Sequence, residues 1–387
     1  MTVTAPRGFR AAGVACGIKP SGDPDLALVA TVDGQPVPAA GVFTSNLATA
    51  APVQVSRAHL AATNGQAAAV VLSSGNANAA TGERGKADAE RMCALAAEGL
   101  GCGPEHVLVC STGLIGFYLP MPALEAGVPA AVAHLTAEGG PSAAEAIRTT
   151  DTHAKQTLVR GDGFTVGGIA KGAAMLAPNM ATMLAVLTTD AAVDSAELQA
   201  ALTAGVADSF NSLSVDGCTS TNDTVLVLAS GAAGAVDATA FRAALAQACA
   251  DLAGQMAGDA EGATKVITVR VTGAVDDAQA RAAARKVAES ELVKCSFYGE
   301  DPYWGRVVSE LGSSGAAFDP DKVRVSYGDT AVCVDGIAAE HDEKAVRAHL
   351  AERNVSVTCD LGLGSGTGVI LTNDLTHAYI DENMRTS

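Results

Sequence analysis

Aromatic residues, basic residues and long apolar runs are all scarce in this sequence. Only 4% of the 387 residues are aromatic, so the core has to be built from aliphatic side chains, with 41 glycines that permit close backbone approach. Basic residues number 25 against 42 acidic ones, and the net charge of −17 argues against binding to nucleic acids or anionic membranes. No apolar run approaches the roughly 20 residues needed to span a membrane, so we expect neither partner.

Cofactor and metal motifs are absent as well. The nine cysteines are dispersed without a CxxC pair, which is typical of reduced thiols and predicts a cytoplasmic protein. The seven histidines show neither HExxH nor HxxxH spacing, so no metal site is expected. The glycine-rich stretch at 361–368 matches neither phosphate-binding loop, and we expect no bound cofactor.

The length indicates two domains or lobes, and apolar runs alternate with amphipathic segments throughout. This alternation predicts an α/β protein with layered sheets and helices. Strands are expected at 27–33, 41–43, 68–75, 106–112, 184–193, 223–230, 265–273, 322–336 and 355–362, with a hairpin over 157–172 that turns at Gly161–Gly163. Helices are expected at 84–99, 121–135, 142–148, 195–208, 239–256, 276–290 and 342–352.

The segment 171–191 combines a chain break with a buried strand. Pro178 and Asn179 interrupt regular structure just before the Ala181–Thr182 bond, and the sequence becomes strongly apolar after it. A small residue before a threonine that opens a buried strand suits an N-terminal nucleophile released by cleavage. An ordinary threonine at a strand start produces the same pattern, so this segment alone leaves both interpretations open.

Two further polar segments follow expected strands or precede them. Residues 110–116 end a strand in Ser-Thr-Gly, where a hydroxyl and a backbone N–H could form an oxyanion hole, although this segment by itself favours an ordinary structural turn. Residues 149–155 place hydroxyls beside an acid, which fits either a polar ligand or a helix cap. The segments at 259–265 and 294–306, which holds the single tryptophan, leave the same choice between site and scaffold.

Taken together, these segments resemble the ornithine acetyltransferase family, the glutamate N-acetyltransferases of arginine biosynthesis. The resemblance runs nearly from end to end, and its most specific block is KGAAMLAPNMATML at 171–184. The other blocks are PRGFRAAGV at 6–14, AGVFTSN at 40–46, SSGNANAATG at 73–82, STGLIG at 111–116, TTDT at 149–152, STNDT at 220–224, DAEGATK at 259–265, GEDPYWGR at 299–306 and TNDLTHAYIDEN at 372–383.

The resemblance implies a two-lobed α/β fold with the active site between the lobes. It implies a precursor that cleaves itself between Ala181 and Thr182 into an α chain of 1–181 and a β chain of 182–387, assembled as a heterotetramer of two α and two β chains. Thr182 would be the nucleophile, with Thr112 and Gly113 as the oxyanion hole. The substrate-binding positions would be Thr149, Lys171, Thr182, Glu261, Asn383 and Ser387.

The implied activity is transfer of acetyl from N2-acetylornithine to glutamate through an acetyl-threonine, with acetyl-CoA as a possible second donor. The chemistry is consistent with this, because cleavage gives Thr182 a free α-amine with a pKa of about 7.7–8.0, which can act as its base. Three other readings stay open: a paralogue that acts on a related acyl amino acid, an N-terminal-nucleophile aminopeptidase, and a small-molecule binding protein with an inert Thr182.

Several positions depart from the family pattern. Ala174 and Tyr303 replace a usual glycine and asparagine, and Leu371 precedes TNDL in place of a larger or polar residue. The tail after Asn383 is one residue shorter than usual, which makes Thr386 an alternative to Ser387 at the last substrate position. The threonine chemistry does not depend on these positions, whereas the choice of acyl donor and acceptor is expected to depend on them.

Overall fold

The computed structural model describes residues 2–175 and 183–384. These residues form two compact units, which are considered separately. The first is drawn from residues 1–211 and 218–256, and the second from 212–217 and 257–386. Two units were expected from the length. The predicted division into an α chain of 1–181 and a β chain of 182–387 concerns cleavage of the polypeptide rather than its folding, and it stays a prediction.

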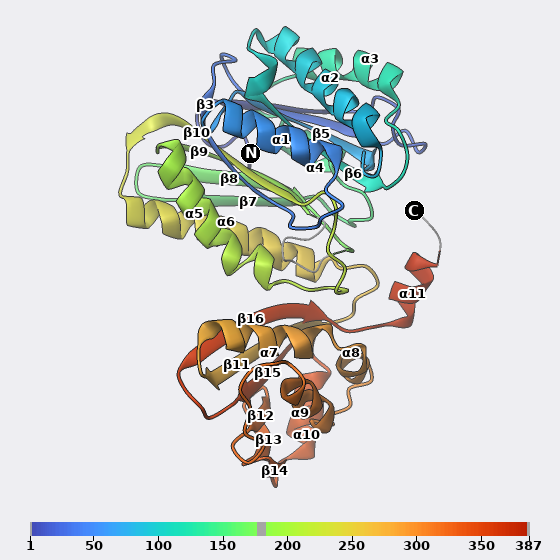
Figure 1. The fold of residues 1–387 in the computed structure, drawn as a ribbon, viewed down its shortest axis with the longest axis vertical. Helices are drawn as coiled ribbons and strands as arrows, with labels where there is room; N and C mark the ends of the chain where they lie inside the picture. The colour runs from blue at the N-terminus through green and yellow to red at the C-terminus, as the bar shows by residue number, and fades with distance from the viewer. Residues whose placement is uncertain (1, 176–182, 385–387) are drawn as a thin grey trace. The chain divides into compact units, whose positions relative to one another are not determined.

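The first unit contains two sheets that are covered by helices on their outer faces (Figure 1). The four-stranded sheet has the order β1 (Phe9–Val14), β2 (Leu26–Thr31), β5 (Ala69–Asn76), β6 (Val107–Leu114). The six-stranded sheet has the order β4 (Gln66–Ala67), β3 (Val37–Phe43), β10 (Thr224–Ala235), β9 (Leu184–Ala192), β8 (Thr165–Lys171), β7 (Lys155–Arg160). The helices are α1 (Ala51–Ala62), α2 (Gly82–Leu100), α3 (Met121–Ala133), α4 (Gly140–Ala146), α5 (Ser195–Ala207) and α6 (Ala238–Gly258).

Alternating side chains explain why β6 is continuously apolar from Val107 to Cys110. Val107 and Val109 pack with the α2 and α3 side of the four-stranded sheet. Leu108 and Cys110 point to the other face, where they pack in one core with Val186 of the six-stranded sheet. Successive residues of a strand face opposite sides, so a sheet between two layers needs apolar residues at every position.

The predicted hairpin and the predicted close backbone approach are both present. β7 and β8 pair antiparallel around a turn in which Gly163 has φ +81°, a conformation that favours glycine. Gly13 of β1 lies against α4 so closely that an added Cβ would fall 1.9 Å from the carbonyl oxygen of Ser142. Small residues therefore replace the bulk that aromatic side chains would have supplied.

The second unit is one sheet with helices. Its strand order is β14 (Ile337–Ala338), β13 (Thr330–Val334), β12 (Arg324–Tyr327), β15 (Asn354–Asp360), β11 (Val266–Ala274), β16 (Gly366–Asn373). Its helices are α7 (Asp277–Glu289), α8 (Glu291–Tyr298), α9 (Gly305–Gly312), α10 (Glu343–Leu350) and α11 (His377–Asn383). Val269 of β11, Val357 of β15 and Val287 of α7 lie in the core of this unit. Trp304 packs against the same core, which supports a scaffold role for the tryptophan.

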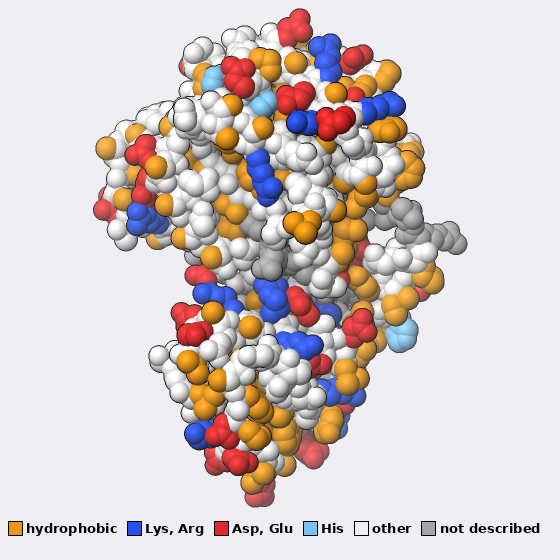
Figure 2. Space-filling model, in the orientation of Figure 1, with side chains coloured by type: hydrophobic (Ala, Val, Ile, Leu, Met, Phe, Trp, Pro, Cys, Tyr) orange, Lys and Arg blue, Asp and Glu red, His pale blue; other side chains and the backbone are white. Residues whose placement is uncertain are grey.

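The prediction of an α/β protein with layered sheets and helices is confirmed. The expected helix at 142–148 is α4, shifted toward the N-terminus, while β1, α1, α8, α9, β16 and α11 were not expected. No helix among the described residues is long and apolar enough to cross a membrane. On the face drawn in Figure 2, basic side chains lie near acidic ones in both units, although acidic residues outnumber basic ones in the sequence.

Candidate active site

The Ser-Thr-Gly motif lies at the end of β6, where the strand leaves the sheet. Thr112 is buried and pairs with the end of β5, which carries an irregularity at Gly75 and Asn76. Gly113 has φ +129°, and an added Cβ would fall 2.3 Å from the carbonyl carbon of Gly75. Any other residue would be strained and would clash with the β5 backbone, so this position requires glycine.

Lys171, the last residue of β8, reaches the same place from the six-stranded sheet. Its ammonium is almost fully buried and donates a hydrogen bond to Oγ1 of Thr112 at 3.3 Å. Lys171 is also paired in register with Leu184, the first residue of β9. The sheet thus places the lysine beside the beginning of β9.

Asp151 forms the anionic part of this polar core. Its Oδ1 accepts hydrogen bonds from Nζ of Lys155 at 2.6 Å and from the amide of Gly172 at 2.7 Å, and Oδ2 accepts from the amide of Thr149 at 3.1 Å. Burial favours the neutral acid, but the charges of Lys171 and Lys155 outweigh it and hold the pKa of Asp151 well below its usual range. A buried carboxylate therefore stands between two buried lysines.

A second buried acid, Asp223, lies just before β10. Its Oδ1 accepts a hydrogen bond from the amide of Met183 at 2.7 Å, while Oδ2 has no hydrogen-bond partner among the described residues. Burial raises the pKa of Asp223 well above its usual range, and the Met183 amide and the charge of Lys171 only partly oppose that effect. This carboxyl group contacts the residue that directly follows position 182.

Asn222 joins the ends of the two sheets. Its Nδ2 donates to the carbonyl of Ala77 at 2.6 Å and to the carbonyl of Ser111 at 2.9 Å. Ser111 precedes Thr112, whereas Asn222 precedes Asp223. The buried side-chain amide of Asn222 therefore fixes the end of β6 relative to the start of β10. In this way it also fixes the position of Thr112 relative to Asp223, the two polar residues on which Lys171 acts.

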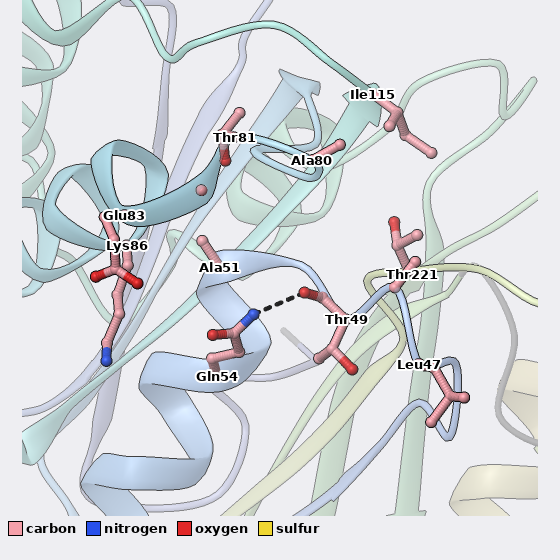
Figure 3. A pocket seen from close by; sticks show the side chains of 12 residues that line it. Leu47, Thr49, Ala51, Gln54, Ala80, Thr81, Glu83, Lys86, Ile115 and Thr221 are labelled. Atoms are coloured by element: carbon pink, nitrogen blue, oxygen red, sulfur yellow. Dashed lines mark hydrogen bonds between the residues drawn. The ribbon is translucent and has the colours of Figure 1, made fainter.

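The end of β6 opens into two adjoining cavities. A narrow one of about 10 Å³ is lined by Thr112, Gly113, Met175 and Thr221, among others. Thr221 and Ile115 also line a larger pocket of about 300 Å³. In Figure 3, Ile115 and Thr221 lie at one end of that pocket, and Glu83 and Lys86 of α2 lie at the other; Gln54 of α1 donates to the carbonyl of Thr49 at 2.8 Å. The narrow cavity has room for about one water molecule, and the larger pocket shares Thr221 and Ile115 with it.

The predicted substrate residues of the second unit also come together. Nδ2 of Asn383, at the end of α11, donates to Oε2 of Glu261 at 2.9 Å. Glu261 lines a cavity of about 140 Å³ with four other acids and one lysine, namely Asp216, Glu289, Glu291, Asp374 and Lys294. Burial lowers the pKa of Lys294 to about 8, although Asp216, Asp374 and Glu289 oppose the shift. The cavity as a whole favours a cationic ligand group.

Thr149 lies slightly apart from Lys171. It lines a pocket of about 220 Å³ with Lys19 and Arg148, and its amide is bound by Asp151. Of the residues predicted from the sequence, Thr112, Gly113 and Lys171 therefore meet in one place, with Thr149 linked to them through Asp151. Glu261 and Asn383 meet in the second unit. Ala181, Thr182 and Ser387 lie outside the described residues, and so does the alternative Thr386.

Sequence reasoning missed three residues of the first unit's polar core. Asp151 stands within a block that was taken for a ligand site or a cap, and Asn222 and Asp223 stand within STNDT, which carried only the family resemblance. For Asn222 and Asp223 the available signal was position, because they directly precede the apolar start of β10. Asp151, four residues before β7, offered no such signal. Among the described residues, no group of three or more histidine, cysteine or acidic side chains is arranged to hold a metal ion.

The chain resembles proteins of arginine biosynthesis along nearly its whole length. It is 49% identical over 384 residues to the "Arginine biosynthesis bifunctional protein ArgJ" of Thermobifida fusca, covering 99% of both chains. The protein of the same name from Mycobacterium tuberculosis is 49% identical over 394 residues, covering 98% of this chain and 95% of the relative. That of Streptomyces coelicolor is 48% identical over 384 residues, covering 99% of both.

Two solved structures carry related names. An ArgJ chain from Bacillus halodurans is 39% identical, with a TM-score of 0.49, and covers 51% of this chain and 95% of its own length. An ornithine acetyltransferase from Mycobacterium tuberculosis in complex with ornithine is 45% identical, with a TM-score of 0.42, and covers 46% of this chain and 94% of its own. The model of the ArgJ family matches residues 10–386. Because that match and the close relatives span nearly the entire sequence, the chain belongs to the ArgJ family.

Proposed function

We propose that this chain is a glutamate N-acetyltransferase of arginine biosynthesis that moves acetyl from N2-acetylornithine to glutamate through an acetyl ester of Thr182. The names of relatives about 49% identical support an enzyme of that pathway. Thr182 becomes the N-terminal residue of a β chain of 182–387 when the precursor cleaves itself after Ala181. The two chains assemble as a heterotetramer of two α and two β chains in the cytoplasm.

The observation that carries this proposal is the hydrogen bond from Lys171 to Thr112. A hydroxyl can accept and donate at the same time. Because Oγ1 of Thr112 accepts from Lys171, its own proton is available to a negatively charged oxygen. Thr112, together with the N–H of Gly113, then forms the oxyanion hole, and the nearby lysine charge strengthens it. Lys171 of this arrangement pairs with Leu184, the first residue of β9, and Leu184 is two residues after position 182 in the sequence.

The transfer takes place in two half-reactions. Thr182 Oγ attacks the acetyl carbonyl carbon of acetylornithine, its proton passes to the Thr182 α-amine, and the carbonyl becomes a tetrahedral oxyanion. Collapse breaks the bond from carbon to the ornithine nitrogen, which takes the proton from the α-ammonium and leaves as a free amine. The α-amine of glutamate then attacks the ester by the same steps in reverse, giving acetylglutamate and the free hydroxyl.

Opposite charges recognise the two ends of the substrate. Lys171 pairs with the α-carboxylate that acetylornithine and acetylglutamate share, while Thr149 contributes a hydroxyl nearby. Glu261, held by Asn383, accepts the side-chain ammonium of ornithine, and the acidic cavity around it supports this choice. Ser387 completes the substrate contacts from the chain end, with Thr386 as the alternative.

Acetyl-CoA is proposed as a second acyl donor, because the relatives are named bifunctional. It would form the same ester and release CoA, so that free glutamate is acetylated without ornithine. No bound cofactor takes part. A hydrolase would pass the acetyl group to water instead, and a paralogue would use another amino acid.

The decisive experiment is mass spectrometry of the purified protein with and without acetylornithine. The mature protein is expected as two chains, the second beginning Thr-Met-Leu, and its N-terminal peptide should gain one acetyl group on incubation. Thr182→Ala is the matched control and should remain one full-length chain. Adding glutamate should remove the acetyl group as acetylglutamate. Release as acetate in the presence of glutamate would favour the hydrolase, and an intact wild-type chain would refute the proposal.

A further inference from the structure

Lys19 lines a pocket of the first unit and has no role so far in the proposed transfer reaction. The pocket measures about 220 Å³, whereas one water molecule needs only about 10–15 Å³. Its lining residues, all within the described part of the chain, are Lys19, Asp23, Pro24, Glu145, Arg148 and Thr149. Thr149 is one of the substrate positions that the family resemblance implies. The pocket therefore has room for part of a substrate molecule.

A buried carboxylate holds the loop that carries Lys19. Asp25 lies directly before β2 and is fully buried. Its Oδ1 accepts a hydrogen bond from the amide of Cys16 at 2.7 Å, and its Oδ2 accepts from the amides of Gly17 at 3.1 Å, Ile18 at 2.6 Å and Lys19 at 3.0 Å. Hydrogen bonds from amides to an ionised carboxylate are among the stronger ones in proteins. The backbone of Lys19 is therefore held in place by contacts that do not involve its side chain.

The stem of Lys19 lies against the end of β5, beside the proposed oxyanion hole. A Cβ added to Gly75 would fall 3.1 Å from Cγ of Lys19. Gly75 is paired in register with Gly113 of β6, whose N–H is proposed for the oxyanion hole. The side chain of Lys19 therefore begins next to the strand ends at which the acyl group is proposed to react.

The two cations of this pocket differ in how they are bound. Arg148 pairs with Glu145 and donates two hydrogen bonds to the carbonyl of Asp151, so its guanidinium is already used. Nζ of Lys19 donates to the carbonyl of Pro24 at 2.8 Å and makes no ion pair with any described residue. Lys19 is thus the cation of the pocket that can bind an anionic ligand.

The charges around Lys19 also favour an anion beside it. Burial lowers the pKa of Lys19, and Arg148 and Lys171 act in the same direction, while Asp25 and Asp23 oppose the shift. Asp25 is already bound by the four amides of the loop. A carboxylate that enters the pocket would stabilise the ammonium of Lys19, because an opposite charge nearby favours the charged form.

The two amino acids of the proposed reaction differ in the charge of their side chains. Ornithine carries an ammonium, for which Glu261 is proposed, whereas the acids that line the cavity of Glu261 would repel the side-chain carboxylate of glutamate. We propose that Lys19 is a specificity-determining residue for the acceptor, and that its ammonium binds the side-chain carboxylate of glutamate, or of acetylglutamate in the reverse direction. The inference rests on the proposed function, since it assumes that glutamate is the acceptor.

The first test is the kinetics of Lys19→Met, which keeps a stem against Gly75 and removes the charge. In a ping-pong reaction, kcat/KM for each substrate reports its own half-reaction. The value for glutamate should fall by about tenfold or more, while that for acetylornithine changes by less than about twofold. The preference for glutamate over glutamine, which has a similar shape but no charge, should fall by the same factor. Lys19→Arg should restore most of the activity with glutamate.

Lys344→Met is the matched control, because it removes an exposed lysine of α10 in the second unit. Both kcat/KM values should then stay unchanged. An unaltered kcat/KM for glutamate in Lys19→Met would overturn the inference. Equal losses with acetylornithine and glutamate would overturn it as well, because Lys19 would then serve the fold or the α-carboxylate that both substrates share.

A second test uses the wild-type enzyme and needs no variant to fold. Lysine side chains are methylated with formaldehyde and a mild reductant, and the labelling of Lys19 is measured by peptide mass spectrometry. N-acetylglutamate, which has no free amine, should protect Lys19, whereas N-acetylglutamine should not. Equal labelling of Lys19 with either compound contradicts the inference. Failure of the wild-type enzyme to become acetylated by acetylornithine would instead count against the proposed function itself.

Discussion

Asp151 and Asp223 are both buried, and both feel the charge of Lys171, yet their pKa values move in opposite directions. Asp151 accepts one hydrogen bond from a lysine and two from backbone amides. From the described residues, Asp223 accepts one, from the amide of Met183. Burial favours the neutral acid at both sites, so the number and charge of the donors decide the outcome. Asp151 is therefore a structural anion, whereas Asp223 favours the neutral acid and leaves Oδ2 without a hydrogen-bond partner among the described residues.

The largest expected effect comes from removing the fixed anion. Asp151→Asn leaves Lys155 and Lys171 buried without their shared carboxylate, so the free energy of unfolding should fall by about 3–5 kcal/mol. The advantage of the parent protein should be present above about pH 4 and be lost as pH falls toward the lower folded pKa. Urea unfolding of both proteins at several pH values measures this. A loss below about 1 kcal/mol would show that the lysines find other partners.

The next effect concerns catalysis at the residue that Lys171 contacts. Thr112→Ala should lower kcat by roughly 100-fold or more, because one oxyanion donor is worth about 3 kcal/mol, while substrate affinity changes little. Thr112→Ser keeps the hydroxyl and serves as the control. Steady-state kinetics on fully processed protein provides the measurement, and a normal kcat in Thr112→Ala would return the Ser-Thr-Gly motif to a structural turn.

A smaller effect should follow when Asp151 is made more like Asp223. Lys155→Met removes one of its two lysine neighbours but leaves the amide donors and Lys171 in place. The pKa of Asp151 should rise toward its usual range, and the free energy of unfolding at neutral pH should fall by about 1–3 kcal/mol. Carboxyl NMR and urea unfolding together test this. An unaltered Asp151 pKa would mean that Lys171 alone maintains the charge.

The smallest effect on stability is expected at Asp223 itself. In the uncleaved Thr182→Ala background, Asp223→Asn should change the free energy of unfolding by less than about 1 kcal/mol near pH 4, where both side chains are neutral, because Asn can still accept from Met183. Since the folded pKa is raised, the parent's contribution from Asp223 is present below about pH 4 and is lost as pH rises through the folded value. Stability measured from pH 4 to 8 should therefore favour the variant increasingly; the opposite slope would contradict the assignment.

The comparison also shows how far sequence reasoning reaches. Strands such as β2 and β6 were predictable because both of their faces are buried and their sequences are continuously apolar. β16 was missed because its glycines gave Gly366–Asn373 the composition of a loop, and α1 was missed because it begins with proline and carries valines. The polar core depends on pairing: Asp223 meets Met183, which is 40 positions away in sequence, only because β9 and β10 are neighbours.

The family motifs predicted Thr112, Gly113 and Lys171 as members of one site, and the structure brings these three together. The roles of Asp151, Asn222 and Asp223 required coordinates. Carboxylates and amides at strand ends have the same composition as turn residues, and only their partners distinguish them. Thr182 and the predicted cleavage remain predictions that the proposed mass spectrometry tests.

The order of strands in the six-stranded sheet has a consequence for how the enzyme is made. β9 and β10 follow position 182, yet they lie between β8 and β3, which precede it. Neither half of the polypeptide can complete this sheet alone, so folding has to come before the cut that we propose after Ala181. If the chain is cut there, the halves stay together through two ladders and a shared core. After denaturation they would have to find each other as separate molecules, so refolding of the mature enzyme becomes concentration-dependent, whereas the uncut chain refolds in a single-molecule process.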